Sequence, residues 1–328
     1  MDTQENTIAN ITKKRNHDTL DKLQDYSQRP TKKTQYSLSD IMIQDLIDNI
    51  TDIESIVNLP NDKYITHNYT MMKLCFLRKP LKELYNMVGI QHIKNDIFRL
   101  IVFFVLKQDK SVIEHKLHTI IEGYPGCGKS KLANIIAHIY SSIRLLSSKD
   151  IIYARRSDLI GEYLGHTAIK TQKVIDNSKH KILIIDENNI MSNYDKRDVF
   201  SKECISTLNK NLKDKQNDFT CIIVSDVNSN DSHRHINFTF SIKKYSNIEL
   251  AKMFTNKLLH DGYDYSFTLN DISLFFQQNP LTYYGSDIDR LTFEVYLESS
   301  LRQFYAKSNT KNIILKDLHK AYKKLYSK

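Results

Sequence analysis

The sequence predicts an α/β fold in which a parallel sheet carries helices on both faces and is followed by a smaller, all-helical region. Two runs, residues 181–185 and 219–224, consist mainly of apolar residues, as expected of parallel strands that are buried on both faces. Helical patterns of apolar residues separate the strands, which favours a doubly wound sheet. After Tyr245 the apolar residues keep helical spacing, so we expect the helical region to begin there.

The N-terminal half of the chain contains the first of these elements in order. Apolar residues at helical spacing predict one helix from Ser39 until Pro60 ends it, and a second helix after Gly89. Residues 118–121 predict a short strand, and the apolar stripe of residues 132–143 predicts the helix behind it.

Changes in composition divide the chain into four parts. Residues 1–36 are polar without a hydrophobic period, which predicts disorder. Residues 37–86 are predicted as a helical extension, 87–245 as the α/β subdomain, and 246–328 as a helical lid that ends in a basic helix. Within the lid, Ser246 with Glu249, and then Ser286 with Asp289, have the spacing of helix starts.

Composition also limits the classes of function. The longest apolar run, residues 100–106, is far shorter than the roughly 20 residues of a membrane helix. The four cysteines are widely spaced, which argues against a disulfide framework or a zinc site. We therefore expect a soluble intracellular protein without a membrane partner, with a cytoplasmic location favoured and a nuclear one possible.

The net charge of +9 is concentrated at the C-terminal end, where residues 301–328 hold eight Lys and Arg against a single acid, Asp317. Such a run is usually a solvated helix face. A contact with nucleic acid is the alternative, because clustered Lys and Arg neutralise phosphates.

A glycine-rich turn after the first strand is the strongest chemical signal. The turn fits the pattern GxxxxGK[ST], and its residues are Gly123, Tyr124, Pro125, Gly126, Cys127, Gly128, Lys129 and Ser130. The glycines let backbone N–H groups point inward, and the following helix N-terminus favours phosphate. Lys129 would contact the β- and γ-phosphates and the Ser130 hydroxyl would bind Mg²⁺, so the turn predicts an ATP site.

An acidic pair, Asp186 and Glu187, stands at the end of the aliphatic run 181–185. By itself such a pair is more often a helix cap, but behind a P-loop it has the form of a Walker B motif. Asp186 would hold the magnesium ion, and Glu187 would be the catalytic residue that polarises the attacking water. Together the two motifs predict a Mg²⁺-dependent ATPase.

With these motifs in place, residues 87–250 resemble the CbbX/CfxQ and SpoVK group of AAA+ ATPases. The matching blocks are residues 87–90, the P-loop, residues 158–167, the Walker B strand and residues 244–250. The resemblance implies a homo-hexameric ring that grips a protein client with the pore loop Tyr163, Leu164 and Gly165. Without the resemblance, Tyr163 is an ordinary tyrosine beside a turn, for which packing is the better interpretation.

The chain departs from the family pattern around the γ-phosphate. Asn188 and Asn189 follow Glu187, where the family has alanine and an aromatic residue. The sensor that detects the γ-phosphate could be Ser225 or Asp226. The family's second sensor arginine aligns with Asp287, and Arg290 lies one helical turn further on.

The arginine finger, which acts across a subunit interface, is expected just before the last strand. Arg234 is the only arginine there, between His233 and His235. The two histidines could suggest a metal, but no third ligand is near.

Three functions remain open at this point. The favoured one is an ATP-driven protein remodeller, and the alternatives are a nucleic-acid-associated AAA+ module and a nucleotide-binding scaffold with little turnover. The altered sensors motivate the scaffold, and the basic C-terminus motivates the nucleic-acid module. The pore-loop residues favour a polypeptide as the partner.

Overall fold

The computed structural model describes residues 45–59, 69–106, 117–143, 146–163, 165–187, 199–214, 218–227, 236, 238–308 and 310–326. The chain divides into a short unit of residues 1–46 and a main unit of residues 47–328, and the sheet and all sites below belong to the main unit. The segment predicted to be disordered, residues 1–36, lies outside the described residues.

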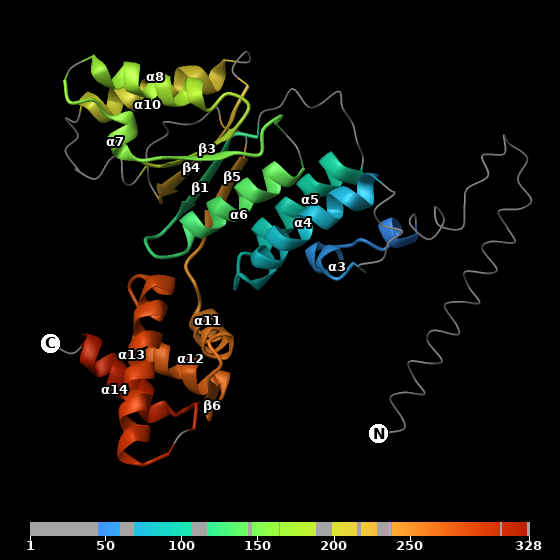
Figure 1. Cartoon of the computed structure of the whole chain (residues 1–328). Coiled ribbons are helices and arrows are strands. Elements are labelled where there is room, and N and C mark those ends of the chain that lie inside the picture. The colour runs from blue at the N-terminus through green and yellow to red at the C-terminus, as the bar shows by residue number, and fades with distance from the viewer. Residues whose placement is uncertain are drawn as a thin grey trace, which may run out of the picture. The chain divides into compact units, whose positions relative to one another are not determined.

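A parallel sheet forms the centre of the α/β region, as the sequence predicts, and it has five strands (Figure 1). Every neighbouring pair of strands in it is parallel, in the order β2-β3-β4-β1-β5. The strands are β1 (Thr119–Gly123), β2 (Ile151–Ala154), β3 (Ile182–Asp186), β4 (Thr220–Asp226) and β5 (Phe238–Ile242). Because parallel strands end at the same edge, the carboxyl ends of β3, β4 and β1 meet there.

Helices cover both faces of this sheet, which confirms the doubly wound fold. Side chains from α8 (His166–Asn177) and α10 (Val199–Lys213) share a core with Leu183, Ile185 and Ile223 of the strands. Successive strand residues point to opposite faces. The other face packs against α6 (Lys129–Ser142), and α4 packs outside α6.

The N-terminal extension differs from the predicted single helix. The chain leaves the helical conformation after Asp48, and a new helix, α3 (Ile53–Val57), begins at the N-cap Asp52. The Asp52 carboxylate accepts a hydrogen bond from the Ser55 N–H at 2.8 Å, and Ser55 bonds back in a capping box. These local bonds compete with a continuous helix, so the prediction of one helix across this region is wrong.

Further helices precede the sheet. The longest of them, α4 (Tyr69–Asn86), contains Pro80 and was not singled out by sequence pattern. The helix predicted after Gly89 is present as α5 (Gln91–Ile101), which continues as one π-helical turn, η2 (Val102–Leu106).

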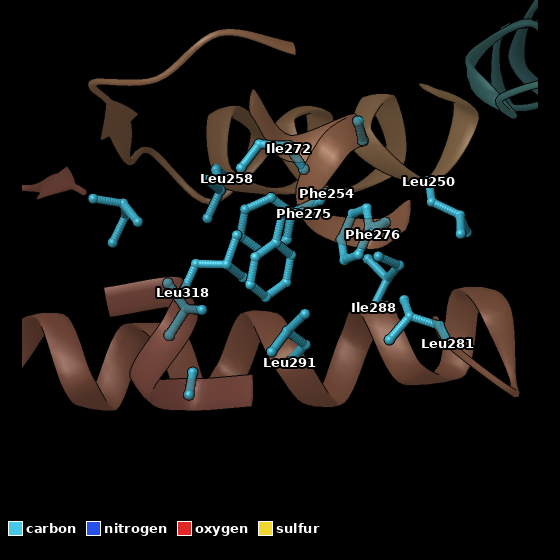
Figure 2. Close-up of a cluster of buried hydrophobic side chains, with 14 residues drawn as sticks. Leu250, Phe254, Leu258, Ile272, Phe275, Phe276, Leu281, Ile288, Leu291 and Leu318 are labelled. Atoms are coloured by element: carbon cyan, nitrogen blue, oxygen red, sulfur yellow. The ribbon is translucent and has the colours of Figure 1, made fainter. Parts of the chain in front are cut away.

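The C-terminal region is helical, as expected, and has its own hydrophobic core. Its helices are α11 (Asn247–His260), α12 (Leu269–Gln278), α13 (Tyr284–Tyr305) and α14 (Leu315–Tyr326). The predicted capping box between Ser246 and Glu249 is present at the start of α11. Figure 2 shows Phe254, Phe275 and Phe276 between these helices, where they contribute to a buried cluster. The Phe276 ring lies edge-on to the rings of Phe254 and Phe275.

Two details of this region correct the sequence prediction. It is not all-helical, because β6 (Asp264–Tyr265) pairs in parallel with β7 (Asn312–Ile313). Strands of two residues are too short to give a sequence period. Helix α13 begins at Tyr284 rather than at Ser286, because the Asp287 carboxylate accepts hydrogen bonds from the N–H groups of Thr282 and Tyr283.

Candidate active site

The P-loop connects the end of β1 to the start of α6, and its conformation depends on glycine. Gly126 and Gly128 have φ angles of 76° and 93°, in the left-handed region that favours glycine. A Cβ on Gly126 would lie 2.1 Å from the carbonyl oxygen of Tyr283. The loop therefore cannot accept a side chain at Gly126 without moving a neighbouring backbone.

Cys127 lies buried at the inner side of the loop. A Cβ on Gly123 would lie 2.6 Å from its sulfur, and Tyr245 Oη donates a hydrogen bond of 2.9 Å to its carbonyl oxygen. Burial raises the pKa of the Cys127 thiol, and the Lys129 charge only partly opposes this. Cys127 therefore supports the loop and is not poised as a nucleophile.

Lys129 is buried, with 7% of its surface exposed, and its ammonium group donates three hydrogen bonds. Two go to the carbonyl oxygens of Gly123 and Tyr124, at 2.9 and 3.1 Å. The third goes to Asp226 Oδ1 at 2.7 Å and is also an ion pair. The loop thus holds its lysine at the carboxyl edge of the sheet.

The predicted Walker B residues lie at the same edge, at the end of β3, which β4 separates from β1. Asp186 ends β3, and Glu187 follows it with only 4% of its surface exposed. Ser225 of β4 donates a hydrogen bond of 2.8 Å to Glu187 Oε2. A buried carboxylate needs such donors, because burial without partners disfavours its charged form.

A cavity of about 540 Å³ brings the predicted magnesium residues together, since both Ser130 and Asp186 line it. Arg155 and Arg156 line it as well, and Arg156 also donates a hydrogen bond of 3.3 Å to Ser201. Sequence reasoning missed these arginines because they lie after β2, far from both nucleotide motifs. Their charge suits an anionic ligand.

The two candidates for the first sensor differ in what they contact. Ser225 bonds Glu187, whereas the next residue, Asp226, bonds Lys129. The candidate for the second sensor, Arg290, is less informative about its role, because its side chain is exposed on α13. Its charge acts on Tyr326 of α14. The pKa of Tyr326 is raised, mainly by burial, and the positive charge of Arg290 opposes part of this rise.

The loop that carries Tyr163 lies between α7 (Arg156–Leu159) and α8. Tyr163 is 66% exposed, so the structure argues against a buried packing role. Gly161 cannot accept a side chain, because a Cβ there would lie 2.7 Å from His166 Cβ. Gly165 has a φ of 81° and is the N-cap of α8, and Leu164 lies outside the described residues.

The start of α13 touches the P-loop, which no sequence pattern indicated. The Gly285 N–H donates a hydrogen bond of 3.0 Å to the Gly126 carbonyl oxygen. The Tyr284 ring lies edge-on to the rings of Tyr124 and Tyr245, with centroids 6.3 and 5.9 Å away.

Several predicted positions cannot be located. Arg234 with its neighbours His233 and His235, and also Asn188 and Asn189, lie outside the described residues. Among the residues that are described, no three His, Cys, Asp or Glu side chains gather into a metal site. None of the described helices is both long and apolar enough to span a membrane.

Together the fold and the site define the class of protein. Residues 119–237 match the ATPase family associated with various cellular activities (AAA). A P-loop between β1 and α6, and an acidic pair at the end of β3, stand on a parallel sheet within that stretch. The protein is an AAA ATPase.

Comparison with curated proteins places the chain more narrowly. It is 33% identical over 292 residues to a cfxQ-like protein of Acanthamoeba polyphaga mimivirus, which covers 85% of this chain and 71% of that protein. The chain therefore belongs to the CfxQ-like AAA ATPases. The resemblance inferred from its motifs is confirmed.

Two further relatives match only part of their own length. Stage V sporulation protein K of Bacillus subtilis is 36% identical over 152 residues, 45% of this chain and 47% of that protein. The ESX-3 secretion system protein EccA3 of Mycobacterium leprae is 28% identical over 156 residues, 46% of this chain and 24% of that protein. The chain thus spans less than half of either relative.

Among solved structures, the chain is similar to Thermotoga maritima RuvB, described as a Holliday junction branch migration motor. The TM-score is 0.50 at 14% identity, over 73% of this chain and 70% of that one. A variant of the same protein gives a TM-score of 0.52 at 15% identity, over 76% and 73% of the two chains. At this identity the similarity concerns the fold alone.

Proposed function

We propose that the chain binds Mg²⁺-ATP at residues 123–130, hydrolyses it with Glu187, and uses the energy to remodel a protein client. The observation that carries the proposal is the cavity lined by both Ser130 and Asp186, at the edge where Lys129 and Glu187 are buried. A cation, two carboxylates and a hydroxyl at one sheet edge suit a triphosphate with its metal ion.

The donor set fits magnesium. Mg²⁺ prefers oxygen ligands, and at nucleotide sites it takes only one or two from the protein, with phosphates and waters completing its shell. The Ser130 hydroxyl and the Asp186 carboxylate would supply these ligands. When bound, the ion would neutralise charge on the phosphate oxygens.

Glu187 is the proposed general base. Its carboxylate would accept a proton from the water that attacks the γ-phosphate, and a fixed position is needed for this role. The hydrogen bond from Ser225 supports that position. We assign Ser225 as a positioning residue, since it would act through Glu187.

Arg234 remains our proposal for the arginine finger, supplied by a neighbouring copy in a homo-hexameric ring. Its loss should leave ATP binding intact and stop hydrolysis. Mixing Arg234→Ala with Glu187→Gln subunits should restore some turnover, because each would supply what the other lacks. No recovery in mixtures that demonstrably co-assemble would contradict the role in trans.

The proposed work of the ring rests on the Tyr163 loop. An exposed aromatic side chain between two constrained glycines suits the gripping of a polypeptide of any sequence, because it offers apolar contact with few rotors to freeze. The sporulation and secretion proteins are named for cellular processes, and those names do not transfer to this chain. The client is therefore proposed only as a polypeptide.

One observation favours the nucleic-acid alternative. Lys316, Lys320 and Lys323 are exposed at helical spacing along α14. Against it, Arg302 is engaged by Asp317, and Lys324 by Glu294. Binding to nucleic acid that weakens steeply with salt would support this alternative over a protein client.

Phosphate release with and without magnesium tests the central proposal. Wild-type protein should release phosphate from ATP only with Mg²⁺. Glu187→Gln should bind ATP equally well and turn over on the order of 10²-fold more slowly. The matched control is Glu83→Gln, an exposed glutamate on α4 that should behave as wild type.

Two outcomes would change the proposal. No turnover by wild type, with ATP bound, would favour the nucleotide-binding scaffold. Unchanged turnover in Glu187→Gln would make Glu187 a structural acid. If both expectations hold, Glu187→Gln in ATP becomes a trap, and a polypeptide retained with it would identify the client.

A further inference from the structure

Asp226 stands out because it binds the lysine on which the nucleotide site depends. Its Oδ1 lies 2.7 Å from Lys129 Nζ, the shortest of the three hydrogen bonds that the ammonium donates. Asp226 is 38% exposed, whereas Lys129 is almost entirely enclosed. The ion pair therefore joins the buried ammonium group of Lys129 to the partly exposed carboxylate of Asp226.

The sheet register explains why these two residues meet. β4 lies beside β1, and Asp226 is paired with Gly123, the residue at which the P-loop begins. The preceding residue, Ser225, points to the other side and bonds Glu187, because strand residues alternate in direction. The end of β4 thus holds the proposed base with one residue and the P-loop lysine with the next.

The contacts of Lys129 imply a competition. An ammonium group has three N–H donors, and here two go to loop carbonyl oxygens and one to the Asp226 carboxylate. A phosphate that binds Lys129 must replace at least one of these bonds. It would also bring negative charge close to the Asp226 carboxylate, which opposes binding.

We propose that Asp226 competes with the nucleotide's phosphates for Lys129, and so lowers the affinity of the site for a triphosphate more than for a diphosphate. The inference rests on the proposed ATP site. The preference follows because the P-loop lysine contacts the β- and γ-phosphates, and only a triphosphate has both. Asp226 does not line the cavity of Ser130 and Asp186, so competition explains its position better than metal binding.

Calorimetry on the full chain tests the proposal, with Mg²⁺ and either a non-hydrolysable ATP analogue or ADP. Asp226→Asn keeps the shape and removes the charge, and should bind the ATP analogue about tenfold more tightly, equivalent to about 1.4 kcal/mol. The gain for ADP should be smaller. Asp226→Ser removes the same charge differently and should change affinity in the same direction.

Asp150→Asn is the matched control. It removes a carboxylate from an exposed ion pair with Lys181, at 3.9 Å, and should leave both affinities at the wild-type value. Thermal melts establish that each variant is folded. If Asp226→Asn is not, Asp226→Ser decides the question.

Two results would overturn the inference. Unchanged affinity in folded Asp226 variants would show that the ion pair does not oppose nucleotide. Weaker affinity would show that Asp226 assists binding. Neither result contradicts the proposed ATP site as long as wild type binds the analogue and Lys129→Ala binds it far more weakly. If wild type fails to bind the analogue, the proposed site itself is wrong.

Discussion

The phosphate-binding edge of the sheet and the Tyr163 loop are both predicted functional regions, but they are built in opposite ways. At the edge, Lys129 and Glu187 are buried, and each has a hydrogen-bonding partner on β4. In the loop, the predicted functional side chain is 66% exposed. Hydrogen-bonding partners hold the side chains at the edge in place, whereas backbone constraints at glycines define the conformation of the loop.

This difference separates two ways in which a residue can serve function. A buried charge is costly without its partner, so changes at the edge should alter chemistry and stability together. An exposed ring contributes little to the fold, and its loss should leave stability unchanged. The predictions below use this contrast, starting from the change with the largest expected effect.

Lys129→Ala should reduce affinity for Mg²⁺-ATP on the order of 10²–10³-fold, the typical loss when one partner of a buried charge contact is truncated. Calorimetry measures the effect. The control is Lys131→Ala, an exposed lysine two residues further along α6. Equal affinities in wild type and Lys129→Ala would remove residues 123–130 from consideration as the nucleotide site.

Gly126→Ala should come next. A left-handed φ costs an alanine roughly 1–2 kcal/mol, and the added Cβ would also meet the Tyr283 carbonyl at 2.1 Å. The variant should melt earlier and bind ATP roughly tenfold or more weakly. Gly262→Ala separates the two causes.

Gly262 has a φ of 77° but nothing within 4 Å of its Cβ position. Its substitution should therefore lower stability alone, with nucleotide affinity retained. If both variants bind ATP as wild type does, the contact between the start of α13 and the P-loop has no importance for the site.

The sequence predicts the nucleotide motifs because their chemistry imposes local rules. The P-loop needs glycines and a lysine at fixed spacing, and the buried strand before Asp186 needs an aliphatic run. By contrast, the ion pair between Lys129 and Asp226 joins residues 97 positions apart. This ion pair forms because β1 and β4 are neighbours in the sheet. The order of the strands cannot be read from the residues of β1 or of β4.

Other failures have local causes. The capping box of Asp52 and Ser55 divides a stretch whose apolar spacing alone predicts one helix. The pairing of β6 with β7 involves too few residues for periodicity to reveal. At the site, Arg155 and Arg156 line the cavity from a strand end that carries no recognisable phosphate motif.

Ser225→Ala should have a smaller effect than the changes in the P-loop. It leaves Glu187 without one of its donors, so kcat should fall about tenfold, in line with about 1–3 kcal/mol for a buried group that loses a partner. The KM for ATP should stay near wild type, because the Ser225 hydroxyl bonds Glu187, whereas the residue on β4 that bonds Lys129 is Asp226. Ser300→Ala is the control, because the Ser300 hydroxyl donates a hydrogen bond to the Tyr296 carbonyl oxygen of its own helix. A normal kcat would exclude the positioning role.

Tyr163→Ala is expected to have the smallest effect on basal ATP hydrolysis and the clearest effect on the remodelling of a client polypeptide. The Tyr163 ring is largely exposed and lies edge-on to the His166 ring, with the centroids 5.5 Å apart. Because it is exposed, its removal should not change the melting temperature. Basal hydrolysis should stay within a few-fold of wild type, since the loop contains none of the proposed nucleotide ligands. Stimulation of the ATPase by a client polypeptide should disappear.

The measurement is a thermal melt beside basal and client-stimulated phosphate release. Tyr305→Ala is a matched control, because this tyrosine is also exposed, at 79%, but ends α13 rather than lying in the loop. A Tyr163→Ala variant that melts early and loses basal turnover would restore the packing interpretation. One that keeps both its fold and its client stimulation would remove the loop from the proposed mechanism, because a gripping side chain cannot be dispensable for the grip.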